Sequence, residues 1–195
     1  MKSPVLRDVP TSLDTERLHL RVPRTGDGQI VFEAVSESLS ELRRFLASLP
    51  WLAGEYTLDT AETFCRTSQA NHLARTDLPY LVFRRDTGRL VGCAGLHRPV
   101  WNTPKLEVGY WGRTSETGHG HITEAVNALV NMAFEQLGAA RIELVVDAEN
   151  TASRRVADRC GFALDGVLRS ERRAPDGSLR DTCIYSRIAK GPVLD

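Results

Sequence analysis

A strand, a glycine-containing loop and a long amphipathic helix follow one another between residues 105 and 137, and this succession constrains the fold more than any other feature. Residues 105–111 are expected as a strand, and Gly118 and Gly120 break the pattern before the helix. The helix is predicted because apolar residues recur every three or four positions. They are Ile122, Ala125, Val126, Leu129, Val130, Ala133, Phe134 and Leu137, and Gly138 is expected to end the helix.

The start of this helix is a candidate anion site. Exposed N–H groups and a partial positive charge at a helix start attract phosphate oxygens, and glycines let the backbone approach a ligand closely. The alternative is a helix start that merely uses glycine. A Walker loop is excluded because Gly120-His121-Ile122-Thr123 lacks its lysine. The dinucleotide fingerprint is excluded because Thr123 stands where it needs a third glycine.

The remaining pattern predicts one mixed α/β domain at residues 15–190, after an N-terminal arm at 1–14 and before a tail at 191–195. Strands are expected at 18–22, 80–84, 90–96, 141–146, 164–172 and 179–188. Helices are expected at 29–37, 39–49, 59–74 and 150–159, with Asp59 and Thr60 placed to cap the third and Asn150 the fourth.

Charge and cysteine usage exclude several classes of protein. The 195 residues carry 25 basic and 25 acidic side chains, so a nucleic-acid partner is not expected. The four cysteines lack the spacing of a disulfide framework or a metal site and are expected to be reduced. The sequence suggests neither a signal peptide nor a membrane span. We therefore expect a soluble, cytoplasmic protein without a membrane partner.

A second motif follows the first after one strand: Asn150-Thr151-Ala152-Ser153 begins a short helix and Gly161-Phe162 ends it. With it, nearly the whole chain resembles the GNAT acetyltransferase superfamily, and more narrowly its branch of ribosomal-protein alanine N-acetyltransferases, RimJ and RimL. The motifs that carry the resemblance are Thr15-Glu16-Arg17-Leu18, the 86–96 hairpin, Gly109-Tyr110-Trp111, Gly118-x-Gly120, Thr123-Glu124-Ala125, Asn150-x-x-Ser153, Gly166-Val167-Leu168-Arg169, Asp181 and Tyr185-Ser186.

This resemblance implies a GNAT-like fold of α+β type, with a mixed, mostly antiparallel sheet flanked by helices, and acetyl-CoA as co-substrate without a metal. The implied CoA-binding residues are Val108, Gly109, Tyr110, Arg113, Gly118, His119, Gly120, His121, Thr123, Asn150 and Ser153. The family's loop usually begins with arginine or glutamine at the place of Ser115, whereas Arg113 lies two residues earlier. His119 or His121 would then substitute by facing the pyrophosphate.

The resemblance also implies roles in the chemistry. Glu107 is the candidate general base, acting through water, with a solvated strand carboxylate as the alternative. Ser153 is the candidate group at the leaving sulfur, against a serine that only satisfies its helix. Tyr185 is a further acid candidate, against core packing. Cys160 is expected to pack rather than react, which favours direct transfer, and His72 and His97 are expected to be structural or exposed.

The implied reaction is transfer of an acetyl group to a primary amine, most simply the N-terminus of a protein or peptide. A small amine such as an aminoglycoside or polyamine is an alternative acceptor. A non-catalytic acyl-CoA-binding module is an alternative of another class, which the Ser115 departure would favour. The resemblance is compatible with a monomer or a homodimer.

Overall fold

The protein is described by a computed structural model that covers residues 3–46, 52, 54–174 and 176–190. Within these residues, eight strands form a single sheet in the order β1-β2-β3-β4-β5-β6-β8-β7. The strands are β1 Ser12–Asp14, β2 Leu18–Arg21, β3 Leu78–Arg84, β4 Leu90–Val100, β5 Lys105–Gly112, β6 Arg141–Asp147, β7 Ala163–Arg173 and β8 Leu179–Ile188. Neighbouring strands run antiparallel except β5 and β6, which are parallel. The mixed, mostly antiparallel sheet is thereby confirmed.

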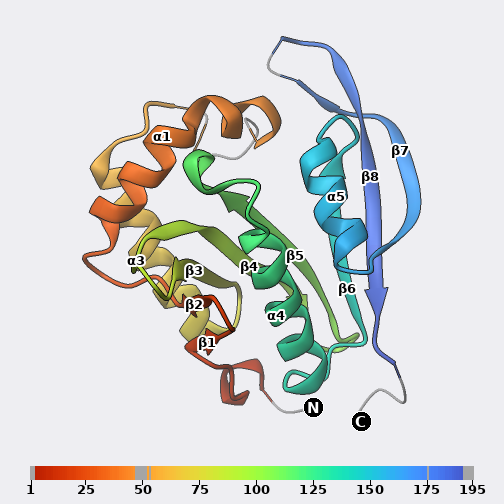
Figure 1. Ribbon diagram of the computed structural model, residues 1–195. Coiled ribbons are helices and arrows are strands. Elements are labelled where there is room, and N and C mark those ends of the chain that lie inside the picture. The colour runs from red at the N-terminus through yellow and green to blue at the C-terminus, as the bar shows by residue number, and fades with distance from the viewer. Residues whose placement is uncertain (1–2, 47–51, 53, 175, 191–195) are drawn as a thin grey trace.

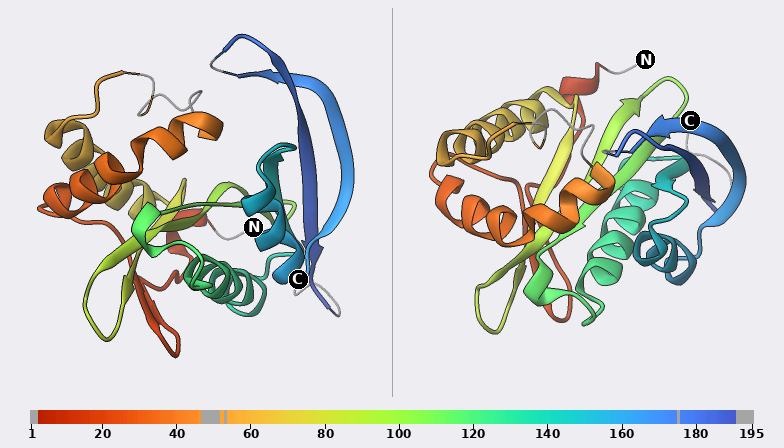
Figure 2. Two further views of the ribbon diagram at one scale, coloured as in Figure 1. Left: turned by 45° about the horizontal axis from the view of Figure 1, so that its top comes forward. Right: turned by 90° about the horizontal axis from the view of Figure 1, so that it is seen from above.

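Helices cover both faces of the sheet (Figure 2). On one face, α1 Gly28–Leu46 and α3 Leu58–Ala74 bury apolar side chains against Cys93 and Trp111 of the sheet. On the other face, α4 His121–Glu135 and α5 Thr151–Arg159 lie over β5 and β6 (Figure 1). There the apolar stripe of α4 packs against Leu96, Val108 and Ile142. Among the described residues no helix has the length and apolar character to cross a membrane.

The parallel strands β5 and β6 pair over only a short stretch and then separate. Lys105, Leu106 and Glu107 of β5 pair with Arg141, Ile142 and Glu143 of β6. Both strands then continue, β5 to Gly112 and β6 to Asp147, and Figure 1 shows them diverging toward the top of the view. A wedge-shaped split therefore opens in the middle of the sheet.

Two expectations about the N-terminal half were wrong. The helices expected at 29–37 and 39–49 form one helix, α1, as far as the structure describes it, and residues 47–49 lie outside the described residues. Inside this helix the Ser38 hydroxyl donates to the Ala34 carbonyl at 2.8 Å, so the buried serine keeps a hydrogen-bond partner. A strand was also missed inside the arm expected at 1–14, since Ser12–Asp14 pairs with β2 as strand β1.

The helix caps were predicted with mixed success. Asn150 caps α5 as expected, because its Oδ1 accepts the Ser153 N–H at 3.0 Å. The cap of α3 is Thr57, whose hydroxyl accepts the Thr60 N–H at 3.2 Å, and not Asp59 or Thr60. The tail expected at 191–195 lies outside the described residues.

A buried histidine joins α3 to the sheet. The Tyr80 hydroxyl donates to the Pro10 carbonyl at 2.6 Å, so it accepts from Nε2–H of His72, 3.2 Å away. The His72 side chain is buried as expected for a structural role, and burial lowers its pKa, with the nearby Arg75 charge acting in the same direction. The folded protein therefore holds His72 neutral.

Acid should destabilise the protein through this residue. The unfolded chain binds a proton at His72 below about pH 6.5 while the folded chain resists it, so the free energy of unfolding should fall as pH drops from 7 to 5. One proton gives a slope of at most about 1.4 kcal/mol per pH unit. His72→Gln, whose amide can still donate to Tyr80, should make the slope shallower in urea titrations. His119→Gln, at an exposed position, should leave the slope unchanged, and equal slopes in all three proteins would contradict the assignment.

Candidate active site

The split between β5 and β6 exposes a strand edge in the middle of the protein. Beyond Glu107 the edge of β5 faces the divergence and not β6. Backbone N–H and C=O groups along such an edge are strong hydrogen-bonding groups that can pair with an extended ligand. Val108, Gly109 and Tyr110, three of the residues expected to bind CoA, lie on this edge.

Two hydroxyl groups meet on the α4/α5 side of the split. The Tyr110 hydroxyl lies 2.8 Å from Oγ of Ser153 and 3.1 Å from the Ser153 carbonyl oxygen. Burial raises the pKa of Tyr110, so its hydroxyl keeps the proton and acts as a donor. Asn150 holds Ser153 in the first turn of α5 through the cap described above. The structure thus brings together Tyr110, Asn150 and Ser153, three of the residues expected at the site.

The glycine loop before α4 has the backbone of an anion site. Gly118 and Gly120 have φ values of +83° and +78°, which residues with a side chain rarely adopt. A Cβ on Gly118 would meet no heavy atom within 4 Å in the part of the chain that the structure describes. Gly120 is the N-cap residue, and Thr123 lies in the first turn of α4. The first backbone N–H groups of α4 are therefore available to phosphate oxygens.

Hydrogen bonds from the first half of this loop to Glu37 fasten it to helix α1. Glu37 accepts the Ser115 N–H at 2.9 Å and the Arg113 Nε–H at 2.7 Å. Those hydrogen bonds hold the pKa of Glu37 down at about 2, with the contact to Ser115 contributing most. The guanidinium of Arg113 is thus directed to α1. Glu37 was missed by the sequence analysis because 78 residues separate it from Ser115.

The buried carboxylate of Glu116 links the loop to neighbouring basic residues. The carboxylate of Glu116 pairs with Arg89 at 2.9 Å and lies 3.9 Å from Nδ1 of His121. Burial lowers the pKa of His121, whose side chain is 8% exposed. What His121 can offer a ligand is therefore its backbone N–H, whereas the His119 ring is exposed on the loop.

The α1/α3 face of the split carries a different set of groups. Glu107 has a side chain 20% exposed and pairs with Arg98 at 2.5 Å. Directly opposite Glu107 on β4 stands His97, whose Nδ1 lies 2.6 Å from Oδ1 of Asp77. His97 was expected only in a structural or exposed role, since nothing in the sequence joins it to Asp77.

Tyr185 and Cys160, two further residues considered from the sequence, are both buried. Tyr185 is buried, and its hydroxyl accepts from Nε of Arg154 at 3.1 Å. Cys160 is buried as expected, its Sγ lies 3.5 Å from the Thr123 carbonyl, and burial raises the pKa of the thiol to about 11. A thiol with that pKa is a poor nucleophile at neutral pH. No group of three or more His, Cys, Asp or Glu side chains suited to a metal ion occurs among the described residues.

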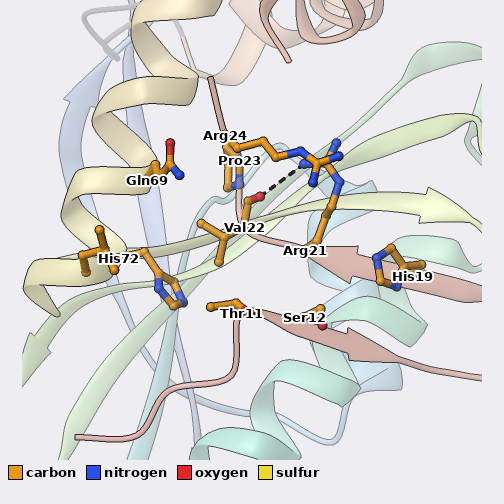
Figure 3. Close-up of a pocket in the computed structure, with 10 residues that line it drawn as sticks. Thr11, Ser12, His19, Arg21, Val22, Pro23, Arg24, Gln69 and His72 are labelled. Atoms are coloured by element: carbon orange, nitrogen blue, oxygen red, sulfur yellow. Dashed lines mark hydrogen bonds between the residues drawn. The ribbon is translucent and has the colours of Figure 1, made fainter. Parts of the chain in front are cut away.

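A separate hollow lies at the other end of the sheet (Figure 3). Its volume is about 360 Å³, and Thr11, His19, Arg21, Gln69 and His72 are among its lining residues. It belongs to the edge formed by β1 and β2, whereas the split lies between β5 and β6. The chemistry-bearing groups described above gather at the split and not at this hollow.

Comparison with known proteins gives a consistent result. Residues 17–163 match the family model described as an acetyltransferase (GNAT) domain. The chain is 29% identical over 176 residues to the uncharacterized N-acetyltransferase YoaA of Bacillus subtilis, covering 90% of this chain and 96% of that protein. It is also 29% identical over 109 residues to the ribosomal-protein-serine acetyltransferase of Escherichia coli, covering 56% and 59% of the two chains. The structure of the microcin C7 self-immunity acetyltransferase MccE, in complex with acetyl-CoA and AMP, superposes with a TM-score of 0.83 at 20% identity, covering 92% and 97%.

The contact between α1 and the loop generates a prediction. Glu37→Gln removes the negative charge that holds Arg113 and weakens the acceptor for the Ser115 N–H, so the loop should open more often. Amide hydrogen exchange of residues 113–118 should become about three- to tenfold faster. Glu33→Gln, on the same helix where Glu33 accepts from Gln29 at 2.7 Å, is the matched control and should leave the loop unchanged. Unchanged exchange in Glu37→Gln would show that the loop holds its shape without α1.

Proposed function

The chain belongs to the GNAT acetyltransferase family and uses acetyl-CoA to acetylate an amine, and we propose that this amine is the N-terminal α-amino group of a protein or peptide. The observation that carries the proposal is the likeness to the ribosomal-protein-serine acetyltransferase, which extends over 109 residues. The α1/α3 face of the split, where the acceptor would bind, is compatible with a peptide. Asp77 and His97 have side chains 30% and 32% exposed, so a chain can approach them from solvent.

The residues at the split fit the co-substrate. The backbone of Gly118–Gly120 and the first N–H groups of α4 would hold the pyrophosphate, because both the left-handed glycines and the helix start favour an anion there. The edge of β5 at Val108–Tyr110 would pair with the amide groups of the pantetheine arm, with Asn150 beside it. A backbone N–H of that edge would stabilise the negative charge that develops on the carbonyl oxygen.

The hydroxyl pair on the α4/α5 side would serve the leaving group. Bond cleavage places a negative charge on sulfur, and Ser153 can donate a proton or a hydrogen bond to it. Tyr110 lies 2.8 Å from Ser153 and can replenish or orient that proton. Tyr185 is the less favoured acid because its hydroxyl is engaged by Arg154. The raised pKa of Cys160 supports direct transfer between acetyl-CoA and the amine, without an acetylated cysteine.

The acceptor side needs a group that takes a proton from the amine. Glu107, acting through water, is the group expected from the sequence, and its carboxylate is engaged by Arg98 at 2.5 Å. His97 is the second group on this face. The choice between the two decides how the acceptor is activated.

Two measurements test this function together. Acetyl-CoA at 100 times its dissociation constant should raise the free energy of unfolding by about 2.7 kcal/mol, seen as a higher melting temperature. A C-terminally amidated hexapeptide beginning with serine should be acetylated at its α-amino group, as shown by mass spectrometry. Ser153→Ala should lower kcat by about 10- to 100-fold, because the thiolate leaves without its donor.

Thr151→Ala, which removes an exposed hydroxyl from the first residue of the same helix, is the matched control and should keep the wild-type rate. Acetylation of spermidine or kanamycin but not of the peptide would establish the small-amine alternative. Stabilisation by acetyl-CoA with the same negligible turnover in wild type and Ser153→Ala would indicate a binding module.

A further inference from the structure

We propose that His97, oriented by Asp77, is the catalytic base that removes the proton from the acceptor amine. This inference rests on the proposed function and deepens it, since it names the residue that activates the acceptor. The two residues are 20 positions apart, His97 on β4 and Asp77 directly before β3. Their geometry, and their place beside the split, carry the assignment.

The contact with Asp77 sets the tautomer of the imidazole. Nδ1 of His97 lies 2.6 Å from Oδ1 of Asp77, and an ionised carboxylate can only accept, so Nδ1 carries the hydrogen. Nε2 is then left with its lone pair. A histidine held in this way by a carboxylate is oriented to take a proton at Nε2 and is stabilised once it has done so.

A pair of glycines lets the ring lie across the sheet toward the split. Gly95 of β4 and Gly109 of β5 are directly opposite each other, on the same face as His97. A Cβ on Gly109 would lie 2.9 Å from Cδ2 and 3.0 Å from Nε2 of His97, and a Cβ on Gly95 would lie 3.1 Å from Nε2. A Cβ at Gly109 would force the ring to move, and a Cβ at Gly95 would crowd the ring and also lie 2.9 Å from Cα of Pro79. Nε2 therefore sits over Gly109, two residues beyond the last pairing of β5 with β6 at Glu107.

The surroundings favour His97 over Glu107 as the base. The charged groups around the ring are Asp77 at 2.6 Å and, on the facing strand, Glu107, whose carboxylate is held by Arg98 at 2.5 Å. On the same face of β4, burial and the charge of Asp77 raise the pKa of the Cys93 thiol to about 12, so Cys93 stays neutral. Histidine is also the side chain whose titration lies nearest neutral pH, which suits a base that must release its proton each turnover.

The step balances in protons and electron pairs. Nε2 takes one proton from the ammonium group of the acceptor, and the nitrogen lone pair thus freed forms the bond to the acyl carbon. The carbon–sulfur bond breaks, its electron pair goes to sulfur, and the second amine proton replaces the one that sulfur receives through Ser153 and Tyr110. The products are the amide, the thiol of CoA and one proton on His97, which passes to water.

Three variants test the assignment with the serine-initiated hexapeptide at saturation. His97→Asn keeps a donor to Asp77 but has no proton acceptor, so kcat should fall by about 10²-fold or more while the KM for acetyl-CoA changes little. The wild-type kcat should decline in acid, because a protonated imidazole cannot accept the amine proton. Asp77→Asn should alter that decline and lower kcat, because the amide can donate to Nδ1 and so place the hydrogen on Nε2. A merely structural role for Asp77 would leave the pH profile in place.

The chain offers a matched control at the far edge of the sheet. His19 also places Nδ1 beside an aspartate, 2.8 Å from Asp14, and His19→Asn should keep both the rate and the pH profile. Glu107→Gln should keep the acidic decline of kcat. Loss of that decline in Glu107→Gln, together with its persistence in His97→Asn, would overturn the proposal in favour of Glu107.

Chemical labelling tests the position of His97 without measuring turnover. Diethyl pyrocarbonate followed by mass spectrometry should modify His97 in the wild type, and acetyl-CoA with the hexapeptide's N-acetylated product should slow that modification at least about fivefold, as expected for occupancy well above Kd. Equal labelling with and without these ligands would overturn the placement of His97 at the site. Absence of turnover with every acceptor in the wild type would instead refute the proposed function.

Discussion

The structure depends on one interruption of backbone pairing. Parallel strands β5 and β6 share hydrogen bonds only as far as Glu107 and Glu143, and both continue beyond that point. Backbone groups within a protein need partners, so an edge opened in the middle of a sheet has to be met by a ligand or by water. The cap of α5 and the Tyr110 hydroxyl meet beside this split, and the loop of Gly118 and Gly120 follows the end of β5. A strand-like acyl carrier with a phosphate group at one end matches that arrangement.

The alternation of a β-strand separates the two halves of the proton chemistry. Consecutive residues of β5 point to opposite faces, so Tyr110 turns toward α4 and α5 while Gly109 turns toward α1 and α3. The hydroxyls of Tyr110 and Ser153 therefore lie on one face of β5, where we propose that the leaving sulfur is held. His97 and Glu107 lie on the other face, where we propose that the acceptor amine binds. A donor and an acceptor kept on opposite sides of one strand cannot neutralise each other directly.

Features that depend on residues close together in the sequence could be predicted, and features that depend on distant residues could not. The Asn150 cap, the amphipathic stripe of α4 and the glycine loop are set by residues a few positions apart, and each was expected correctly. The Glu37–Ser115 and Asp77–His97 contacts span 78 and 20 residues and depend on strand register and helix placement. Composition and periodicity carry no signal for either. The continuity of α1 was missed because the burial of its apolar face against α3 and the sheet shows only in three dimensions.

The central claim is that the opened edge of β5 holds acetyl-CoA. Backbone amide chemical shifts of the ¹⁵N-labelled protein, followed by NMR during titration with acetyl-CoA, test it most directly. If β5 binds acetyl-CoA, the amide chemical shifts of Val108, Gly109, Tyr110 and Gly120 should change. Those of Thr11, Ser12 and His19 at the hollow of Figure 3 should not. Shifts confined to the hollow, with β5 unchanged, would contradict binding at β5 and place the ligand at the edge of the sheet formed by β1 and β2.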